Sequence, residues 1–339
     1  MDLATLWFLI VGFFFIGYFV LDGFDFGVGM SLPFLGKDDT DRRQIINTIG
    51  PVWDLNETWL IVAGASLFAA FPYWYATLFS GFYLALLLIL VALILRGVSF
   101  EYRHQGRSPE WSAAFDRMIV IGSAVPALLW GVAFANIVQG TPIDEAGNFT
   151  GTLFTLLNPY GLLGGLTTLL LFFTHGVQFV ALKTDGELRE RARALAARAG
   201  IATIVVAAAF LTWTVLAHLD APHAAVIAAL AAAAALTLIG ATLANRAGRE
   251  GWAFGLSAVT TLLAVATILA AMFPNVMPST IDPAYSLTIE NASSTEYTLQ
   301  VMTWVAVFMV PLVLLYQGWT YWVFRKRVTR ASIPVGAAH

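Results

Sequence analysis

The sequence predicts an all-α polytopic membrane protein, and three observations support this class. Hydrophobic residues make up 59% of the 339 residues and charged residues only 12%, whereas a soluble domain carries about 25% charged residues. The apolar residues form runs of about 20 or more, the length that a helix needs to cross the hydrocarbon core. Basic residues collect at every second connection between these runs, as in a chain that crosses a bilayer repeatedly.

Nine runs are long and apolar enough to be expected as transmembrane helices. They cover residues 3–33, 51–70, 75–95, 111–138, 160–182, 200–218, 222–244, 252–273 and 298–324. No Lys or Arg precedes the first run, so it lacks the basic start of a signal peptide and is expected to be retained. The second begins at Pro51, which suits the first helical position. Pro126 is expected to kink the fourth helix, the seventh is rich in alanine, and Pro311 lies within the ninth.

The placement of charge predicts the orientation of these helices. All 18 Lys and Arg residues lie around the first, third, fifth and seventh connections or after the ninth run. Arg96 and Arg107 lie around the third connection, between the third and fourth runs. Basic residues favour cytoplasmic connections, which predicts an outer N-terminus and a cytoplasmic C-terminus. The outer connections 139–159 and 274–297 are expected to lack elements of their own, and the connection 183–199 to form a short helical extension.

Two pairs of acidic residues lie in the apolar runs. Asp22 and Asp25 belong to the first run, and Asp54 and Glu57 open the second, directly after Trp53. Each pair is three residues apart and therefore shares a helix face. Both pairs fall toward the cytoplasmic end of their helices and are joined by a short connection, so we expect them to be near neighbours.

Two interpretations of these acids are open. They are either hydrated interface residues that pair with Arg42 or Arg43, or part of a proton entry path from the cytoplasm. Ionisable residues within membrane helices are costly and mark proton relays or ion pathways. For Glu57 a plain role at the helix end is an equal alternative.

Several kinds of site are excluded or unsupported. The chain has no cysteine, which excludes disulfides, thiolate metal sites and cysteine nucleophiles. His175 is the only histidine well inside an expected span, whereas a bis-histidine haem site needs two. Methionines such as Met272, Met277 and Met302 are expected to pack rather than to ligate haem. The sequence has no P-loop, nucleotide fingerprint, hydrolase triad or zinc motif, and nothing supports nucleic-acid binding.

Several blocks resemble one known family. GYFVLDGFDFGVGM, LGKDDTDRRQIINTIGPVWDLNETWLIVAGASLFAAFP and FSGFY resemble the N-terminal half of subunit II of cytochrome bd quinol oxidases. GVAFANIVQG and LLNPYGLLGGL are similar to its middle, and AMFPNVMPS and LQVMTWVAVFMVPLVLLY to its end. The match extends over nearly the whole chain in family order.

The resemblance implies a fold, an activity and partners. Subunit II is expected to form two four-helix bundles, here residues 1–138 and 160–273, plus a peripheral ninth helix at 298–324. It pairs in the cell membrane of a bacterium or archaeon with subunit I, which carries two haem b and one haem d. Their complex oxidises quinol and reduces O2 to water. Subunit II is expected to bind no haem, and the resemblance leaves room for a structural quinone in a lipid-facing cleft and a small accessory subunit.

The resemblance also implies site residues. The acid of the family's cytoplasmic proton channel falls on Asp54, with Trp53 beside it, and Asp22 and Asp25 fall on a first-helix acid motif. Leu55 stands where family members often have glycine. No catalytic or metal-ligating residue is expected in this chain.

Two other functions remain open at this point. Paired acids and glycine-rich helices also suit a proton-coupled secondary transporter. A pure assembly scaffold is the third interpretation, under which the four acids would have no role in turnover.

Overall fold

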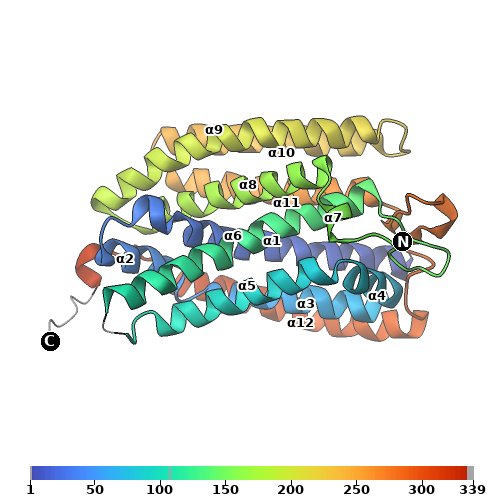
Figure 1. Cartoon of the computed structure of the whole chain (residues 1–339), viewed down its shortest axis with the longest axis horizontal. Helices are drawn as coiled ribbons and strands as arrows, with labels where there is room; N and C mark the ends of the chain where they lie inside the picture. Colours follow the sequence, from blue (N-terminus) through green and yellow to red (C-terminus); the bar gives the residue numbers. More distant parts are fainter. Residues whose placement is uncertain (1, 107, 334–339) are drawn as a thin grey trace.

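The computed structural model describes residues 2–106 and 108–333, so Arg107 lies outside the described part. The chain is almost entirely helical, and its long helices run side by side along one axis (Figure 1). The helices are α1 (Leu3–Leu35), α2 (Asp39–Ile49), α3 (Trp53–Ala70), α4 (Pro72–Gly81), α5 (Tyr83–Tyr102), α6 (Pro109–Gln139), α7 (Leu153–Leu156), α8 (Pro159–Lys183), α9 (Gly186–Ala217), α10 (Ala224–Arg246), α11 (Glu250–Met272) and α12 (Glu296–Val323).

Helix α1 occupies the middle of the molecule and packs against α3, α6, α8 and α11. Its closest approach is to α8, where Gly27 faces Gly176. A Cβ atom added to Gly27 would lie 2.0 Å from the carbonyl oxygen of Phe172 and 2.7 Å from the Cα atom of Gly176. Small residues allow membrane helices to approach this closely. The same packing carries Asp22 and Asp25 of α1 into the interior.

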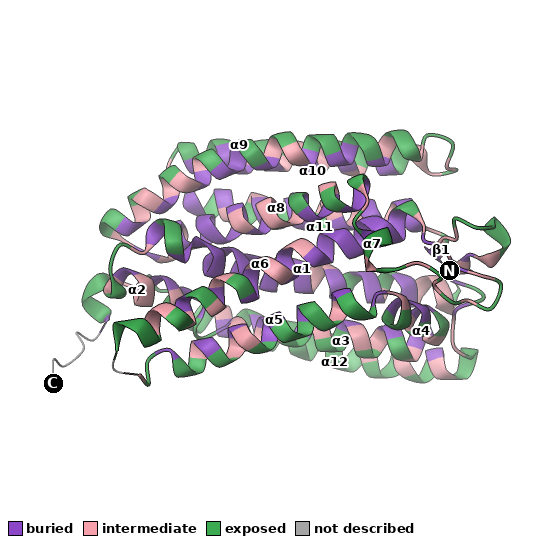
Figure 2. Ribbon diagram, in the orientation of Figure 1, coloured by how far each residue is buried: buried purple, intermediate pink, exposed green. Residues whose placement is uncertain are grey.

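The outward faces of the helices are largely exposed (Figure 2), and many of the exposed residues are large and apolar. Helix α12 is the extreme case, because only Leu299, Gln317 and Thr320 of its 28 residues are buried. Exposed apolar area of this extent marks contact with lipid or with another subunit.

Eight of the described helices are long and apolar enough to cross a membrane, namely α1, α5, α6, α8, α9, α10, α11 and α12. The predicted all-α polytopic class is therefore confirmed. The expected span at residues 51–70 corresponds to α3, which packs against α1. Its first two turns carry Asp54, Asn56 and Glu57, and these polar residues lower its mean hydropathy. The count of nine spans and their orientation stay predictions.

The boundaries of the third expected span are wrong. The helix is interrupted at Phe82. Residues 75–81 therefore belong to the short helix α4, and the long helix α5 starts only at Tyr83. Helix α5 therefore extends to Tyr102 and includes Arg96, which we had assigned to a cytoplasmic connection. Helix α6 is not interrupted at Pro126, the residue at which a kink was expected.

The connections hold more structure than expected. Residues 39–49 form the helix α2, which buries Ile45 and Ile49 and whose N-cap residue Asp38 accepts a hydrogen bond from the backbone N–H of Asp41. The predicted extension at 183–199 is helical but is continuous with α9. The outer connections were expected to lack elements, and this is wrong. The first contains α7, and the second contains a two-stranded antiparallel sheet of β1 (Asn275–Met277) and β2 (Leu287–Thr288).

Candidate functional site

A cluster of charged residues lies buried between α1, α3 and α5. Asp22 of α1 accepts a hydrogen bond from Arg96 of α5 at 2.7 Å, and neither side chain is exposed to solvent. The Arg96 guanidinium also lies 4.4 Å from the centre of the Phe26 ring. An arginine at this depth needs counter-charges, and Asp22 is the first of them.

Glu57 of α3 is the second counter-charge of Arg96. Its carboxylate lies 3.0 Å from Nη2 of Arg96, the nitrogen that also contacts Asp22. The Glu57 side chain is 24% exposed. One nitrogen of Arg96 thus joins an enclosed carboxylate to one that reaches the surface. We call Asp22, Asp25, Glu57 and Arg96 the acid cluster.

Asp25 makes its hydrogen bond to Asn56, which also binds two residues of α12. Asn56 donates from Nδ2 to Asp25 Oδ2 at 2.8 Å. The side-chain oxygen Oδ1 of Asn56 accepts from Gln317 at 2.9 Å and from the Tyr321 hydroxyl at 2.8 Å. This polar chain ties α1, α3 and α12 together in a region that is otherwise apolar.

Several atoms of the acid cluster have no partner within the described residues. They are Asp22 Oδ2, Asp25 Oδ1 and the Nε and Nη1 atoms of Arg96. Leaving buried polar groups unpaired is costly, and such groups commonly bind ordered water. The cluster therefore has free hydrogen-bonding capacity on both of its buried acids.

Asp54 and Trp53 lie beside the acid cluster rather than in it. Asp54 is exposed in the first turn of α3. Trp53 is half-buried and packs on Phe100, with 5.2 Å between the ring centres. The expected pair of Asp54 and Glu57 is thus split, because only Glu57 reaches Arg96.

The interpretation of Asp22 and Asp25 as hydrated interface acids is wrong. Both are fully buried, and their partners are Arg96 and Asn56. Arg42 instead contacts Asp116 at 3.2 Å. The expectation that the two acid pairs are neighbours holds for Asp22 and Glu57, which share one arginine.

The comparisons with known proteins identify the family. The model for the family "Cytochrome bd terminal oxidase subunit II" matches residues 3–324. The chain belongs to the cytochrome bd terminal oxidase subunit II family. Cytochrome bd ubiquinol oxidase subunit 2 of Bacillus subtilis is 40% identical over 329 residues, which are 97% of this chain and 97% of that protein.

Two further comparisons agree with this subunit II assignment. Cytochrome bd-I ubiquinol oxidase subunit 2 of Escherichia coli K12 is 40% identical over 365 aligned positions, 98% of this chain and 96% of the relative. A chain in the structure of bd oxidase from Geobacillus thermodenitrificans is 17% identical and has a TM-score of 0.73. The match covers 96% of this chain and all of that one, so the two share a fold. The sequence resemblance is confirmed.

His175 of this subunit II has no ring nitrogen free to ligate a haem. His175 is buried, with Nδ1 2.6 Å from Ser257 Oγ and Nε2 3.2 Å from the carbonyl oxygen of Val20. Its ring stacks on Phe254, with 4.6 Å between the centres. Both ring nitrogens are therefore occupied. No group of three His, Asp or Glu residues suited to a metal ion exists in the part of the chain that the structure describes.

Four residues of the site were not predicted as site residues from the sequence, namely Arg96, Asn56, Gln317 and Tyr321. Arg96 had a usable signal, because it directly follows the run LILVALIL and precedes GVSF. A lone arginine in such surroundings predicts a buried acid partner. Gln317 and Tyr321 lie one turn apart on α12, but their partner is 261 residues away or more, and no local pattern indicates it.

Proposed function

We propose that this subunit is the haem-free partner of a haem-bearing subunit I in a quinol:O2 oxidoreductase. We further propose that its acid cluster carries protons consumed when O2 is reduced to water. Family membership supports the first part, since relatives are named ubiquinol oxidase subunits. The two haem b and the haem d are assigned to subunit I, in agreement with the engaged nitrogens of His175.

The observation that carries the proton proposal is the sharing of Arg96 by two carboxylates of different exposure. Asp54 is exposed on α3, and Glu57 lies one turn further along and is partly exposed. Asp22, which binds the same Arg96 nitrogen as Glu57, is closed off from solvent. These groups form a graded route from the surface inward, with Asp54 as the outer acid and Trp53 shaping its surroundings.

The charge balance of the cluster supports the same role. Three carboxyl groups face one guanidinium, so full ionisation would leave an excess of negative charge in apolar surroundings, which is unfavourable. A proton held within the cluster removes that excess. The unpaired oxygens of Asp22 and Asp25 are suited to bind the water through which such a proton moves.

The proposed orientation gives the route its direction. With the N-terminus outside, the α2 end of the molecule faces the cytoplasm of a bacterial cell membrane, and protons enter there. Chemistry that draws its protons from this side builds a membrane potential without a pump stroke. A structural quinone and a small accessory subunit stay expectations from the family resemblance.

The test is steady-state oxygen consumption by the purified complex with quinol as donor. Glu57→Gln and Asp54→Asn remove a titratable proton and nearly keep the shape, so each is expected to lower turnover several-fold or more. Glu101→Gln, at an exposed position on α5, is the matched control and should behave as wild type. Haem spectra must stay intact in all three variants.

The result decides between the remaining interpretations. Wild-type turnover in both variants, with the haems in place, would refute the proton role and leave an assembly scaffold. The competing transporter class has lost its support, because the chain belongs to an oxidase subunit family.

A further inference from the structure

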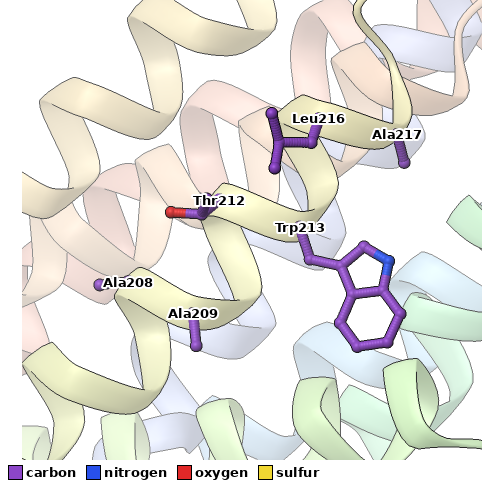
Figure 3. A pocket seen from close by; sticks show the side chains of 6 residues that line it. All are labelled: Ala208, Ala209, Thr212, Trp213, Leu216 and Ala217. Atoms are coloured by element: carbon purple, nitrogen blue, oxygen red, sulfur yellow. The ribbon is translucent and has the colours of Figure 1, made fainter.

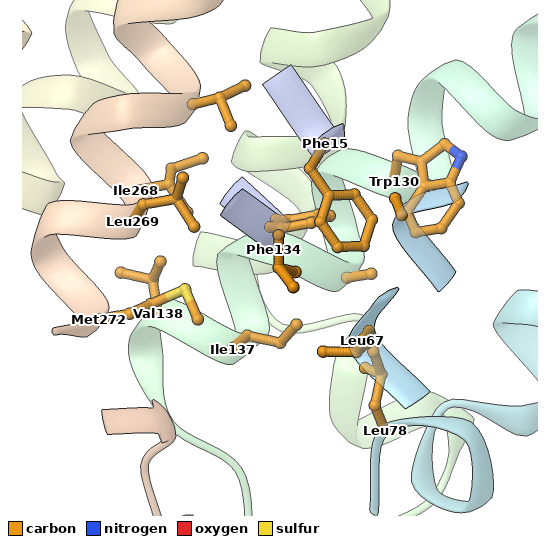
Figure 4. Packing of buried hydrophobic residues seen from close by; sticks show 14 of the residues in the cluster. Phe15, Leu67, Leu78, Trp130, Phe134, Ile137, Val138, Ile268, Leu269 and Met272 are labelled. Atoms are coloured by element: carbon orange, nitrogen blue, oxygen red, sulfur yellow. The ribbon is translucent and has the colours of Figure 1, made fainter. Parts of the chain in front are cut away.

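A largely enclosed cavity of about 130 Å³ lies between α8, α9, α10 and α11, closed on its inner side by α1 and α6. It is separate from the acid cluster and shares no lining residue with it. Most of its wall is aliphatic or aromatic, with Phe172, Leu238 and Ala234 among the most buried members. Figure 4 shows Phe134 of α6 between Trp130 of α6 and Ile268 of α11, and all three line the cavity.

The polar groups of the wall are already paired within the protein. Four threonines contribute to the lining, and each hydroxyl donates to a backbone carbonyl. The bonds run from Thr167 to Leu163 at 2.7 Å, from Thr168 to Ala127 at 2.6 Å, from Thr260 to Leu256 at 2.9 Å and from Thr261 to Ser257 at 3.1 Å. The indole N–H of Trp130 donates to the Tyr18 hydroxyl at 3.2 Å.

These contacts make the cavity unsuitable for water. A buried water needs two to four polar partners, whereas apolar cavities of about 150 Å³ stay dry and take up benzene or xenon. The cavity is of that size, and its threonine hydroxyls already donate to backbone carbonyl groups. An occupant must therefore be small and apolar.

The cavity borders the outer surface of the helices between α9 and α10, because Ala208 and Ile239, which are exposed, line it. Ala208 lines both the cavity and a shallow depression on the outer face of this helix. Figure 3 shows that depression, formed by Ala208, Ala209, Thr212, Trp213, Leu216 and Ala217, all of them exposed. Ile239 of α10, which is 40% exposed, also lines the cavity.

We propose that this cavity is a binding site for small apolar molecules that enter from the bilayer, and that O2 is its occupant in the cell. O2 is apolar, dissolves preferentially in hydrocarbon and fits the volume. Its choice as occupant rests on the proposed function, because the oxidase consumes it. The existence of the dry site does not depend on that function.

The test uses crystals of the whole oxidase complex pressurised with xenon, which scatters anomalously. Wild type should show a xenon peak between α8, α9, α10 and α11. Ala234→Leu fills the cavity from α10 and should reduce that peak to background, whereas Leu238→Ala enlarges it and should raise the occupancy. Ala232→Leu adds the same volume on the exposed side of α10 and should leave the peak unchanged.

Each outcome bears on the proposal. Ordered water in the cavity, or xenon peaks elsewhere but none here, would overturn the site. Equal occupancy in wild type and Ala234→Leu would do the same. A mixture of xenon with excess O2, without quinol, should lower the xenon occupancy; an unchanged peak would overturn the assignment to O2. None of these readouts requires turnover, so they are independent of the proton proposal.

Discussion

At the scale of single residues, Arg96 organises the interior. It holds carboxylates from two helices on one nitrogen, and it does so without solvent exposure of its own side chain. A buried charge of this kind is tolerated only while its partners are present. The stability of the helix packing around Arg96 and the proposed proton route therefore depend on the same side chain.

Replacing Arg96 with Met leaves Asp22 buried without a counter-charge. Breaking a buried ion pair in this way costs about 3–5 kcal/mol, so Arg96→Met should lower the melting temperature of the purified complex strongly. The double variant Arg96→Met with Asp22→Asn should recover part of the loss, because no lone charge remains. Arg117→Gln, on the exposed face of α6, serves as control. A double variant no better than the single one would show that charge burial is not the cause.

Single site residues were predictable where the signal lies in the residues that flank them in the sequence. Asp22, Asp25 and Glu57 were recognisable because acids in apolar runs are rare. Which residues pair was not predictable, because Arg96 is separated from Asp22 by 74 residues and Tyr321 from Asn56 by 265. Asp54 matches a family motif, but its exposure depends on the rotation of α3 against α1.

At the scale of elements, the contact of α1 with α8 sets the position of the acids. Gly27→Ala would place a methyl group 2.0 Å from a backbone oxygen, and backbone atoms cannot yield as a flexible side chain can. Overpacking costs typically about 1–3 kcal/mol, so this variant should lower thermal stability and the yield of the assembled complex. Gly255→Ala, which meets open space in α11, should be neutral or slightly stabilising. Equal behaviour of the two variants would contradict the packing argument.

The segment after α12 folds back onto the α2 end. Val328 donates to the carbonyl oxygen of Lys183 at 2.8 Å and accepts from Gln44 at 2.8 Å. Arg330 contacts Asp38 at 2.6 Å and also pairs with Asp41. The hydrogen bond from Arg330 lowers the pKa of Asp38 below its ordinary value.

This shift predicts the pH dependence of the segment. The pKa of Asp38 is lowered when the segment is docked, so ionised Asp38 stabilises the docked segment. This stabilisation is complete above the ordinary pKa of about 3.9 and is lost as the pH falls through the lowered pKa. The chain has no cysteine, so a fluorophore on Ser332→Cys labels one site in this subunit. Its anisotropy should stay constant from neutral pH to about pH 4 and fall below. Asp38→Asn should remove this acid-dependent step; an unchanged profile would contradict the assignment.

Element-level prediction was accurate for the long helices and poor for the connections. Helices α6, α8, α10 and α11 match their expected spans closely because their apolar runs are bounded by polar or turn residues. The break at Phe82 was not predicted, although Ser80 and Gly81 directly precede it. The pairing of β1 with β2 was missed because each strand has only two or three residues.

At the scale of the whole molecule, the chain combines two regions with different interiors. The half around α1, α3, α5 and α12 contains the polar acid cluster, whereas the half around α8 to α11 contains a dry cavity. The composition and the spacing of apolar runs were sufficient to predict the membrane class. They do not report which helix faces meet, and that arrangement determines whether a buried acid is paired or free.

The central claim is that protons reach the site of O2 reduction through the acid cluster, and transient proton uptake tests it most directly. Fully reduced complex is mixed with O2 in weak buffer, and a pH indicator follows the uptake of protons during haem oxidation. The account predicts that Glu57→Gln slows proton uptake and the proton-coupled haem step together, while Glu101→Gln leaves both at the wild-type rate. Uptake at the wild-type rate in Glu57→Gln, with intact haem spectra, would contradict it.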